Sequence, residues 1–209
     1  MGEKTTLSIP TLKRLPLYCN IAQHALDNGK KLISSSEIAD CLNIDSTQVR
    51  KDIAAIGYGG KPRVGFDSKE LVKYIKKYLD LDKLNDVILV GAGNLGVALA
   101  RYKGFLLQGI NIKALFDNDP NLVGFDLDGK QILSIDELEN YISENKIKIA
   151  ILTVPASVAQ ETADKLFSFG IKGIFNFAPF NIIHPKDVIV WNQDLVSNFI
   201  TFMKFVKTS

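Results

Sequence analysis

The six residues from 91 to 96 have the composition of a phosphate-binding loop: Gly91, Ala92, Gly93, Asn94, Leu95 and Gly96. They follow the apolar run Asp86–Val90 and precede a helical pattern from Val97 to Tyr102. Between a strand and a helix, the first glycine allows a tight turn and the second lets a pyrophosphate approach the backbone. The third lets the helix pack closely on the strand, and the phosphates rest on the helix N-terminus. The segment therefore predicts a dinucleotide-binding site formed by these six residues.

Asp117 extends this prediction to the ribose. It ends a second predicted strand, Ile112–Phe116, and lies 21 residues after Gly96. An acidic residue at about this distance accepts hydrogen bonds from the adenosine ribose. Its charge would repel a 2′-phosphate, and residues 118–121 include no arginine to bind one. The sequence therefore favours NADH and NAD+ over their phosphorylated counterparts.

The sequence around this loop predicts alternating strands and helices, which would position it. Further strands are predicted at residues 147–154, 171–177 and 188–191, which indicates a parallel, doubly wound sheet. Ligands of such sheets bind at the carboxyl ends of the strands. We expect the nicotinamide end of the cofactor beside the residues found there, which are Thr153, Val154, Pro155, Asn176, Phe177, Ala178 and Pro179.

The front of the chain has a different pattern, which predicts a helix-turn-helix. A helical pattern over residues 11–28 is followed by Ser34 and Glu37 at the spacing of a capping box. A short helix should run to Leu42, and after a tight turn Ser46 should cap a second helix that reaches Ile56. Two short helices joined by such a turn are typical of DNA-binding proteins.

Basic and small polar residues lie where this motif would meet DNA. The predicted contacts to phosphates or base edges are Ser46, Thr47, Gln48, Arg50 and Lys51 in the second helix and Lys61 and Arg63 in a glycine-rich hairpin or wing. Residues 1–85 hold 14 basic and 10 acidic residues, whereas residues 86–209 hold 11 and 13. A basic N-terminal part joined to an acidic C-terminal part is typical of a nucleic-acid-binding domain attached to a second domain.

The last predicted helix, from Asp194 to about Lys207, is apolar around most of its circumference. Its apolar residues are Leu195, Val196, Phe199, Ile200, Phe202, Met203, Phe205 and Val206. Such a helix must be buried, either on its own domain or in a partner subunit. Insertion into a partner explains the pattern better, and a homodimer also suits a helix-turn-helix that reads an inverted repeat.

The remaining residues argue against several classes of protein. The two cysteines form no metal-ligand or disulfide pattern, and neither His24 nor His184 accompanies a paired carboxylate or a nucleophile. We therefore expect no metal and no enzyme activity. No apolar run reaches the length of a membrane span, and the N-terminus lacks a secretory pattern, so we expect a cytoplasmic protein without membrane contact.

Two alternative functions remain for the glycine-rich module. A small NAD-dependent oxidoreductase would need an acid or base near the hydride acceptor, and the sequence offers no such set. A CoA-binding module, like that of acyl-CoA ligases, has a similar glycine-rich domain. That alternative leaves the basic helix-turn-helix unexplained and predicts CoA binding without DNA binding.

In their order and spacing the motifs resemble those of the Rex family, bacterial transcriptional repressors that respond to NADH relative to NAD+. The matching segments are RLPLY at 14–18, QVRKDIAAIG at 48–57, GKPRVGF at 60–66, GAGNLG at 91–96, FDNDP at 116–120, LTVPA at 152–156 and GIKGIFNFAP at 170–179. The resemblance implies an α/β protein with an N-terminal winged helix-turn-helix domain at 1–84 and a Rossmann domain at 85–192. It also implies a domain-swapped C-terminal helix at 193–209, binding to an inverted-repeat operator in double-stranded DNA, and release by NADH.

The resemblance also suggests a switch. By position, Tyr102 and Asp194 match family residues that link the cofactor site to the swapped helix. Leu195 replaces a phenylalanine of some members, which alters the packing expected near the nicotinamide. Asn20 stands where the family usually has an arginine that pairs with the aspartate matching Asp194, and an asparagine cannot form that ion pair. In the wing, Pro62 and Arg63 replace the more usual order of a basic residue and a glycine.

Overall fold

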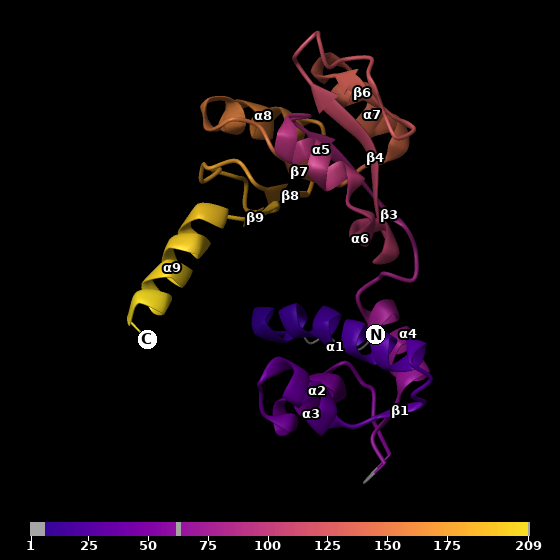
Figure 1. The fold of residues 1–209 in the computed structure, drawn as a ribbon. Helices are drawn as coiled ribbons and strands as arrows, with labels where there is room; N and C mark the ends of the chain where they lie inside the picture. Colours follow the sequence, from indigo (N-terminus) through magenta and orange to yellow (C-terminus); the bar gives the residue numbers. More distant parts are fainter. Residues whose placement is uncertain (1–6, 62–63, 209) are drawn as a thin grey trace. The chain divides into compact units, whose positions relative to one another are not determined.

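The computed structural model describes residues 7–61 and 64–208, in two compact units (Figure 1). The first unit spans Met1–Lys83 and the second Leu84–Ser209. Each unit has its own hydrophobic core.

The first unit is a winged helix-turn-helix. Its helices are α1 (Ile9–Asp27), α2 (Ser35–Leu42), α3 (Ser46–Ala55) and α4 (Ser68–Tyr78). They enclose a core that includes Leu15, Tyr18, Ile38, Ile53 and Leu71, all fully buried. A two-stranded antiparallel sheet pairs β1 (Leu32–Ile33) with β2 (Phe66–Asp67). The strand β2 follows the glycine-rich wing that contains Lys61.

The helix boundaries confirm some sequence expectations and correct others. The capping box of Ser34 and Glu37 at the start of α2 is confirmed, with both reciprocal hydrogen bonds present. The expectation that Ser46 caps α3 is wrong, because Asp45 is the N-cap and its carboxylate accepts the Thr47 N–H. A helical pattern continues in the sequence over residues 69–85, but α4 ends at Tyr78, and Asp80 takes a left-handed conformation with φ of 54°.

The second unit is built on a seven-stranded, mostly parallel sheet. Its strands, in the spatial order β5-β6-β4-β3-β7-β8-β9, are β5 (Asp126–Leu127), β6 (Lys130–Ser134), β4 (Ile110–Asp117), β3 (Asn85–Val90), β7 (Ile149–Leu152), β8 (Gly173–Asn176) and β9 (Ile189–Asn192). Without the antiparallel edge strand β5, this is the strand order of the Rossmann fold. The predicted doubly wound sheet is therefore confirmed.

Helices cover both faces of this sheet. Residues of α5 (Asn94–Arg101) and α6 (Lys103–Leu107) pack with Val87 and Leu89 on one face. On the other face, α7 (Leu138–Asn145), preceded by the short 3₁₀ helix η1 (Ile135–Glu137), and α8 (Ala156–Ser168) pack with Ile88 and Val90. Because neighbouring residues of β3 point to opposite faces, the strand is buried on both sides and reads as a continuous apolar run.

The β5–β6 hairpin was absent from the sequence prediction. Asp128 and Gly129 form its turn, both with positive φ (54° and 85°). An Asp-Gly pair is a known signal for a two-residue hairpin turn, so this element had a signal in the sequence. The hairpin places β6 beside the strand that ends at Asp117.

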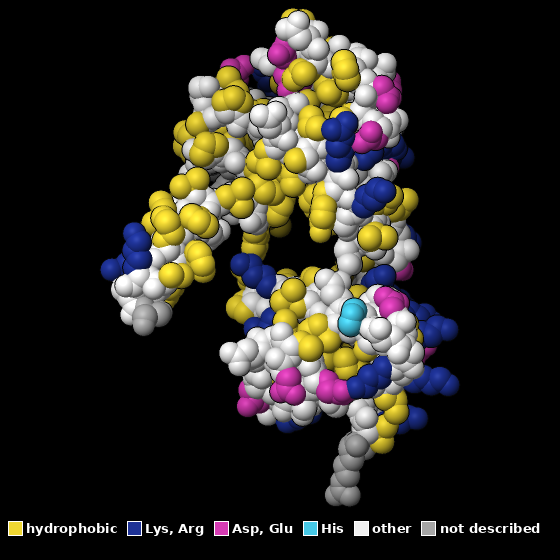
Figure 2. Space-filling model, viewed as in Figure 1, with side chains coloured by type: hydrophobic (Ala, Val, Ile, Leu, Met, Phe, Trp, Pro, Cys, Tyr) yellow, Lys and Arg dark blue, Asp and Glu magenta, His cyan; other side chains and the backbone are white. Residues whose placement is uncertain are grey.

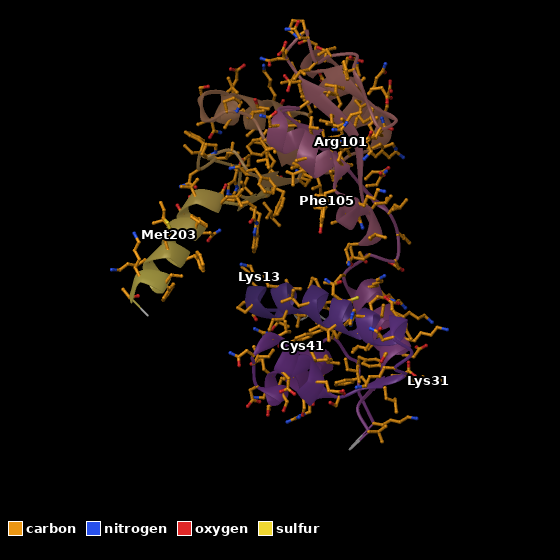
Figure 3. The ribbon with its side chains drawn as sticks, viewed as in Figure 1. Lys13, Lys31, Cys41, Arg101, Phe105 and Met203 are labelled. Carbon is orange, nitrogen blue, oxygen red and sulfur yellow. The ribbon has the colours of Figure 1, made fainter. Side chains whose placement is uncertain are left out.

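The final helix α9 (Leu195–Thr208) has no buried residue. Hydrophobic side chains are visible along it in Figure 2, and Met203 marks it in Figure 3. Phe205 and Val196 are 68% and 67% exposed. Within the part of the chain that the structure describes, no helix is long and apolar enough to cross a membrane.

Candidate functional site

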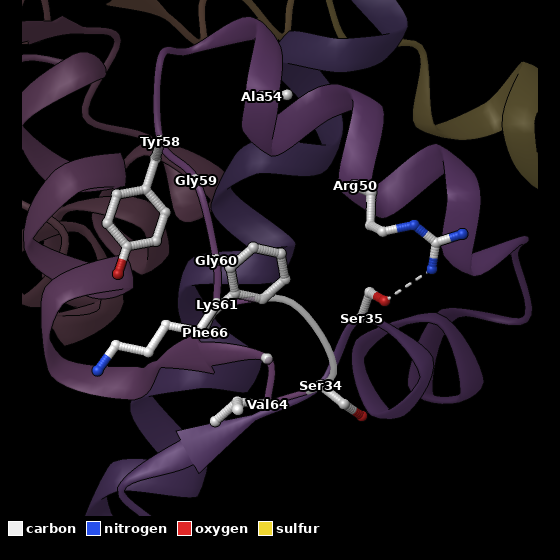
Figure 4. A pocket seen from close by; sticks show the side chains of 11 residues that line it. Ser34, Ser35, Arg50, Ala54, Tyr58, Gly59, Gly60, Lys61, Val64 and Phe66 are labelled. Carbon is white, nitrogen blue, oxygen red and sulfur yellow. Dashed lines mark hydrogen bonds between the residues drawn. The ribbon is translucent and has the colours of Figure 1, made fainter.

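The exposed face of α3 presents the residues predicted to contact DNA. Thr47, Arg50 and Lys51 are exposed, whereas Val49 and Ile53 are buried in the core, as the helical spacing predicted. The Arg50 guanidinium donates hydrogen bonds to Ser35 Oγ (3.1 Å), Ser46 Oγ (3.3 Å) and Thr47 Oγ1 (3.0 Å). Three hydroxyls therefore hold this cation at the N-terminal end of the helix, with the Ser35 contact visible in Figure 4.

A groove of about 390 Å³ lies between α3 and the wing (Figure 4). It is lined by Ser34, Ser35, Arg50, Ala54, Tyr58, Gly59, Gly60, Lys61, Val64, Gly65 and Phe66. Arg50 and Lys61 bring two positive charges, and no carboxylate stands among the described residues that line it. Arg63, the other predicted wing contact, lies outside the described residues. Such a groove suits an anion such as a DNA phosphate.

A buried ion network lies beneath α3, and sequence reasoning missed it. Asp52 is 2% exposed and accepts hydrogen bonds from Arg14 Nε (2.7 Å) and Arg14 Nη2 (3.0 Å). It also accepts from the Tyr18 hydroxyl (2.7 Å), Gln48 Nε2 (2.8 Å) and Thr11 Oγ1 (3.2 Å). Arg14, Tyr18 and Thr11 lie 38, 34 and 41 positions before Asp52, so the sequence carried no local signal for their contacts, whereas Gln48 lies only four positions before Asp52.

The network fixes the charge of Asp52. Burial alone raises the pKa of this carboxyl, but the hydrogen bonds from Arg14, Tyr18 and Gln48 together lower the pKa below its usual value. Burial, followed by the hydrogen bond to Asp52, raises the pKa of Tyr18 to about 12. Asp52 is therefore ionised and Tyr18 protonated at neutral pH, which ties α1 to α3.

In the second unit, the glycine-rich loop has the geometry that a pyrophosphate site requires. Gly91 has a φ of 101°, and a Cβ there would lie 2.8 Å from the Thr153 carbonyl carbon. A Cβ at Gly93 would meet only open space, so the backbone is accessible at this point. A Cβ at Gly96 would overlap the Gly91 carbonyl oxygen. The three glycines therefore fit the three predicted roles of turn, close approach and helix packing.

Asp117 holds this loop from the neighbouring strand. Its carboxylate accepts hydrogen bonds from the Ala92 N–H (2.5 Å) and from the Asp119 N–H (2.9 Å). From β7, Thr153 Oγ1 lies 2.7 Å from the Gly91 carbonyl oxygen and 3.1 Å from that of Val90. The loop is therefore preorganised by side chains from both adjacent strands.

An open pocket of about 660 Å³ lies at the carboxyl ends of these strands. Of the predicted cofactor residues, it is lined by Gly91, Gly93, Leu95, Asp117, Thr153, Val154, Pro155, Phe177 and Pro179. Its other lining residues are Val90, Asn118, Asp119, Leu122, Ile135, Val158, Glu161, Thr162 and Lys165. Sequence reasoning missed these because they come mainly from α8 and the loop after β4, whose patterns indicate only a helix and a turn.

The remaining predicted cofactor residues, Ala92, Asn94, Gly96, Asn176 and Ala178, lie outside the pocket lining. Asn176 is 1% exposed and acts within the fold. Its Nδ2 donates to the Phe180 carbonyl (2.9 Å) and to Asn192 Oδ1 (2.8 Å), and its Oδ1 accepts the Ala178 N–H (2.9 Å). Asn176 thus holds the loop that carries Phe177 and Pro179 into the pocket.

The predicted switch residues lie on the surface of this unit. Tyr102 is 64% exposed, links α5 to α6 and packs edge-on against Phe105 at 5.7 Å between ring centroids. Asp194 precedes α9 and accepts hydrogen bonds from the Ser197 hydroxyl (2.5 Å) and N–H (2.8 Å), which lower the pKa of its carboxyl. Leu195 is 58% exposed at the start of α9.

The titratable residues of the described chain form no group of three side chains that could hold a metal ion. His184 Nδ1 lies 2.9 Å from the Pro185 carbonyl oxygen, and His24 lies beside Asn28. Neither histidine lines the pocket at the carboxyl ends of the strands.

Comparison with known proteins covers almost the whole chain. A family model described as a putative DNA-binding protein N-terminus matches residues 6–54, and one described as a CoA binding domain matches residues 82–180. Redox-sensing transcriptional repressors named Rex are similar over nearly their full length. That of Thermoanaerobacter sp. strain X514 is 38% identical over 96% of this chain and 90% of its own. The Rex repressor of Desulfitobacterium hafniense is 43% identical over 92% of this chain and 93% of its own.

Solved structures agree with this assignment. RSP in complex with NAD+ and operator DNA matches with a TM-score of 0.91 and 36% identity, over 98% of this chain and 94% of that one. RSP in complex with NADH matches with a TM-score of 0.87, over 98% of this chain and 96% of that one. RSP is itself a Rex-family repressor. With both units and their order shared, the chain belongs to the Rex family of redox-sensing transcriptional repressors.

Proposed function

We propose that this chain is a transcriptional repressor that binds an inverted-repeat operator and leaves it when NADH occupies the pocket of the second unit. The observation that carries the proposal is the full-length similarity to RSP, which has been solved both with operator DNA and NAD+ and with NADH. The cationic face of α3 and the preorganised glycine loop support the two halves of the proposal. The protein would act in the cytoplasm, where bacterial operators lie.

The DNA-binding role belongs to the exposed face of α3 and to the wing. We assign contacts with phosphates or base edges to Ser46, Thr47, Gln48, Arg50, Lys51, Lys61 and Arg63. Hydrogen bonds already hold Arg50 in place, which lowers the conformational entropy lost on binding. The open groove between α3 and the wing leaves room for the DNA backbone.

The choice between NADH and NAD+ follows from the charge of the nicotinamide ring. The ring is cationic in NAD+ and neutral in NADH, and burial in apolar surroundings costs much more free energy for the charged form than for the neutral one. Val154, Pro155, Phe177 and Pro179 line the pocket with apolar side chains. Leu195 of a partner subunit would close it. NADH is therefore the form that favours the closed state.

The exposed apolar surface of α9 supports a homodimer, in which each C-terminal helix inserts into the other subunit. The proposed organisation is a DNA-binding domain at 1–84, a Rossmann domain at 85–192 and a swapped helix at 193–209. Tyr102 and Asp194 would connect the cofactor site to that helix. A dimer also matches the two-fold symmetry of an inverted repeat.

Catalysis is not part of the proposal. An oxidoreductase needs an acid or base beside the hydride acceptor. Neither histidine lines the pocket, and Glu161 and Lys165, which do line it, form an ion pair with each other at 2.9 Å. The match to a CoA-binding domain covers residues 82–180 and leaves the DNA-binding unit unexplained. Titration with CoA separates this alternative, because a CoA module would bind CoA and leave an operator unaffected.

The direct test is fluorescence anisotropy with a labelled inverted repeat that the protein has itself selected from random DNA, at fixed salt. Release by NADH at concentrations where NAD+ and CoA have little effect would support the repressor. Tight binding that is indifferent to both nucleotides would overturn the sensing role. Failure to select any DNA would overturn the whole proposal.

We expect Lys51→Ala to weaken operator binding about tenfold or more. Lys51 is exposed on α3, and a lysine that contacts a base edge or phosphate contributes about 1–3 kcal/mol. Lys186→Ala is the matched control, since Lys186 is exposed in the loop before β9 of the second unit. Anisotropy of the selected operator measures both variants. Equal affinities of the two would remove Lys51 from the interface.

We expect Asp117→Asn to lower the preference for NADH over NADPH. The variant keeps one acceptor oxygen for the loop but loses the charge that repels a 2′-phosphate. A hydrogen bond to a charged group contributes about 1.5–3 kcal/mol, so NADH affinity should fall by about 10- to 100-fold. Calorimetric titration with both nucleotides measures this. Asp187→Asn, an exposed position before β9, should leave the preference unchanged.

A further inference from the structure

Three consecutive serines lie at the start of α2, and the structure gives two of them different roles. Ser34 is the N-cap of the helix and forms the capping box with Glu37. Ser35 is the first residue of the helix, and its Oγ accepts a hydrogen bond from Arg50 Nη1 at 3.1 Å (Figure 4). Ser36 is exposed on the same turn. Ser35 therefore joins α2 to the exposed face of α3.

The Ser35 contact differs in kind from the other two that hold Arg50. Ser46 and Thr47 lie on α3 itself, four and three residues before Arg50, so they hold the guanidinium only relative to its own helix. Ser35 lies 15 residues before Arg50, on another helix. Its own position is fixed, because the capping box holds the start of α2 and Ile38, three residues later, is fully buried. Of the three hydroxyls, that of Ser35 alone ties Arg50 to a second element of the fold.

Neutral acceptors orient the Arg50 guanidinium without cancelling its charge. The contrast is Arg14, whose guanidinium is paired with the Asp52 carboxylate at 2.7 Å. A guanidinium has five N–H groups, and three hydroxyl contacts leave at least two of them for another acceptor. Ser35 and Arg50 both line the groove between α3 and the wing. Arg50 is therefore held in place there and still able to donate to a phosphate or a base edge.

We propose that Ser35 is a positioning residue for Arg50: its hydroxyl holds the guanidinium in the arrangement that binds operator DNA, and it affects DNA affinity through Arg50. The inference rests on the proposed function, since it requires α3 to contact DNA. An exposed arginine loses rotamer freedom when it binds, and a hydrogen bond that is formed beforehand reduces this loss. The helix α2 thus contributes to DNA binding through a residue of α3.

The test is a double-mutant cycle on the full-length protein, with anisotropy of the inverted repeat that the wild type selects from random DNA. All variants are measured at one salt concentration, low enough for Arg50→Ala to bind measurably. Ser35→Ala should weaken binding about three- to tenfold, the size expected for one hydrogen bond. In the Arg50→Ala background the same substitution should change the affinity less than about twofold, because the group that Ser35 positions is gone.

The cycle separates positioning from two simpler roles of Ser35. A hydroxyl oxygen that accepts from Arg50 keeps its own hydrogen, which could donate directly to a phosphate. In that case Ser35→Ala would weaken binding by the same factor with and without Arg50, and the inference would be overturned. A loss that comes only from a less stable α2 would also be equal in the two backgrounds, with the same consequence.

Ser36→Ala is the matched control, because it makes the same change in helix propensity at the next residue of α2. Its operator affinity should stay within about twofold of the wild type. Ser35→Thr keeps the hydroxyl and should retain wild-type affinity within about threefold. Equal losses in Ser35→Thr and Ser35→Ala would show that the hydroxyl is not what matters and would contradict the inference.

Two outcomes separate the role of Ser35 from the repressor function. Wild-type operator affinity in Arg50→Ala would overturn the inference, since there would be no contact to position, and would leave the repressor function intact. Failure of the wild-type protein to select any DNA would overturn both.

Discussion

Replacing Gly96 by alanine is expected to abolish the NADH-driven release of the operator while nucleotide-free operator binding persists. A Cβ at this position would overlap the Gly91 carbonyl oxygen and would lie 3.0 Å from both Leu89 Cδ2 and Thr153 Oγ1. The obstacle at Gly91 is backbone, so the loop itself must shift. A displaced loop no longer presents its N–H groups and the start of α5 to a pyrophosphate.

The expected loss of NADH affinity is at least about 100-fold, because even a 1 Å misplacement in a preorganised site can have an effect of that size. Overpacking should also lower the free energy of unfolding of the second unit by about 1–3 kcal/mol. Calorimetric titration of NADH and anisotropy of the operator measure the two functions separately.

Gly173→Ala is the control for this variant. Gly173 opens β8 in the same unit, and its Cβ would meet Ile149 Cγ1 at an ordinary contact distance of 3.7 Å. The control should bind NADH and release DNA as wild type does. Normal NADH affinity in Gly96→Ala would show that the glycine loop does not hold the cofactor.

Asp52→Ala is expected to have the largest effect on the stability of the first unit. It leaves the Arg14 guanidinium without its carboxylate and the fully buried Tyr18 hydroxyl without its acceptor. Breaking a buried ion pair by removing one partner costs about 3–5 kcal/mol. Urea unfolding followed by circular dichroism measures the change in the full-length protein.

The control for stability is Asp45→Ala, which removes the exposed N-cap of the same helix and should lower the free energy of unfolding much less than Asp52→Ala does. The pH dependence provides a second readout. The fold lowers the pKa of Asp52. The carboxylate therefore contributes its full stabilisation at pH values above about 3.9, the pKa of an aspartate in an unfolded chain. This contribution is lost as the pH falls through the lower pKa that Asp52 has in the folded protein. Asp52→Ala should lack this part of the acid sensitivity, and equal costs for the two variants would contradict the account.

The sequence predicts the parts of this molecule that depend on local patterns. The glycine spacing at 91–96 and the capping box of Ser34 and Glu37 each involve residues close in the chain, and the structure confirms their geometry. The apolar periodicity of α3 also predicts which of its residues are buried. Local patterns were sufficient here because each interaction spans one turn or one helix.

Features that depend on competition between neighbours, or on distant contacts, were not predictable in this way. Asp45 and Ser46 are both residue types that can cap α3, and the N-cap in the structure is Asp45. The end of α4 depends on a left-handed Asp80, which an aspartate tolerates but does not require. The Asp52 network joins α1 to α3 across 38 and 34 residues, and the α8 side of the pocket arises only when the sheet forms.

The central claim is that the two sites are energetically coupled, and the most direct measurement is the NADH affinity of the free protein and of the operator-bound protein. Linkage requires that NADH weaken DNA binding by the same factor by which DNA weakens NADH binding. A coupling free energy of about 3 kcal/mol corresponds to about 150-fold. We predict that operator-bound protein binds NADH more weakly by a factor of this order. Equal NADH affinities in the two states would contradict the account.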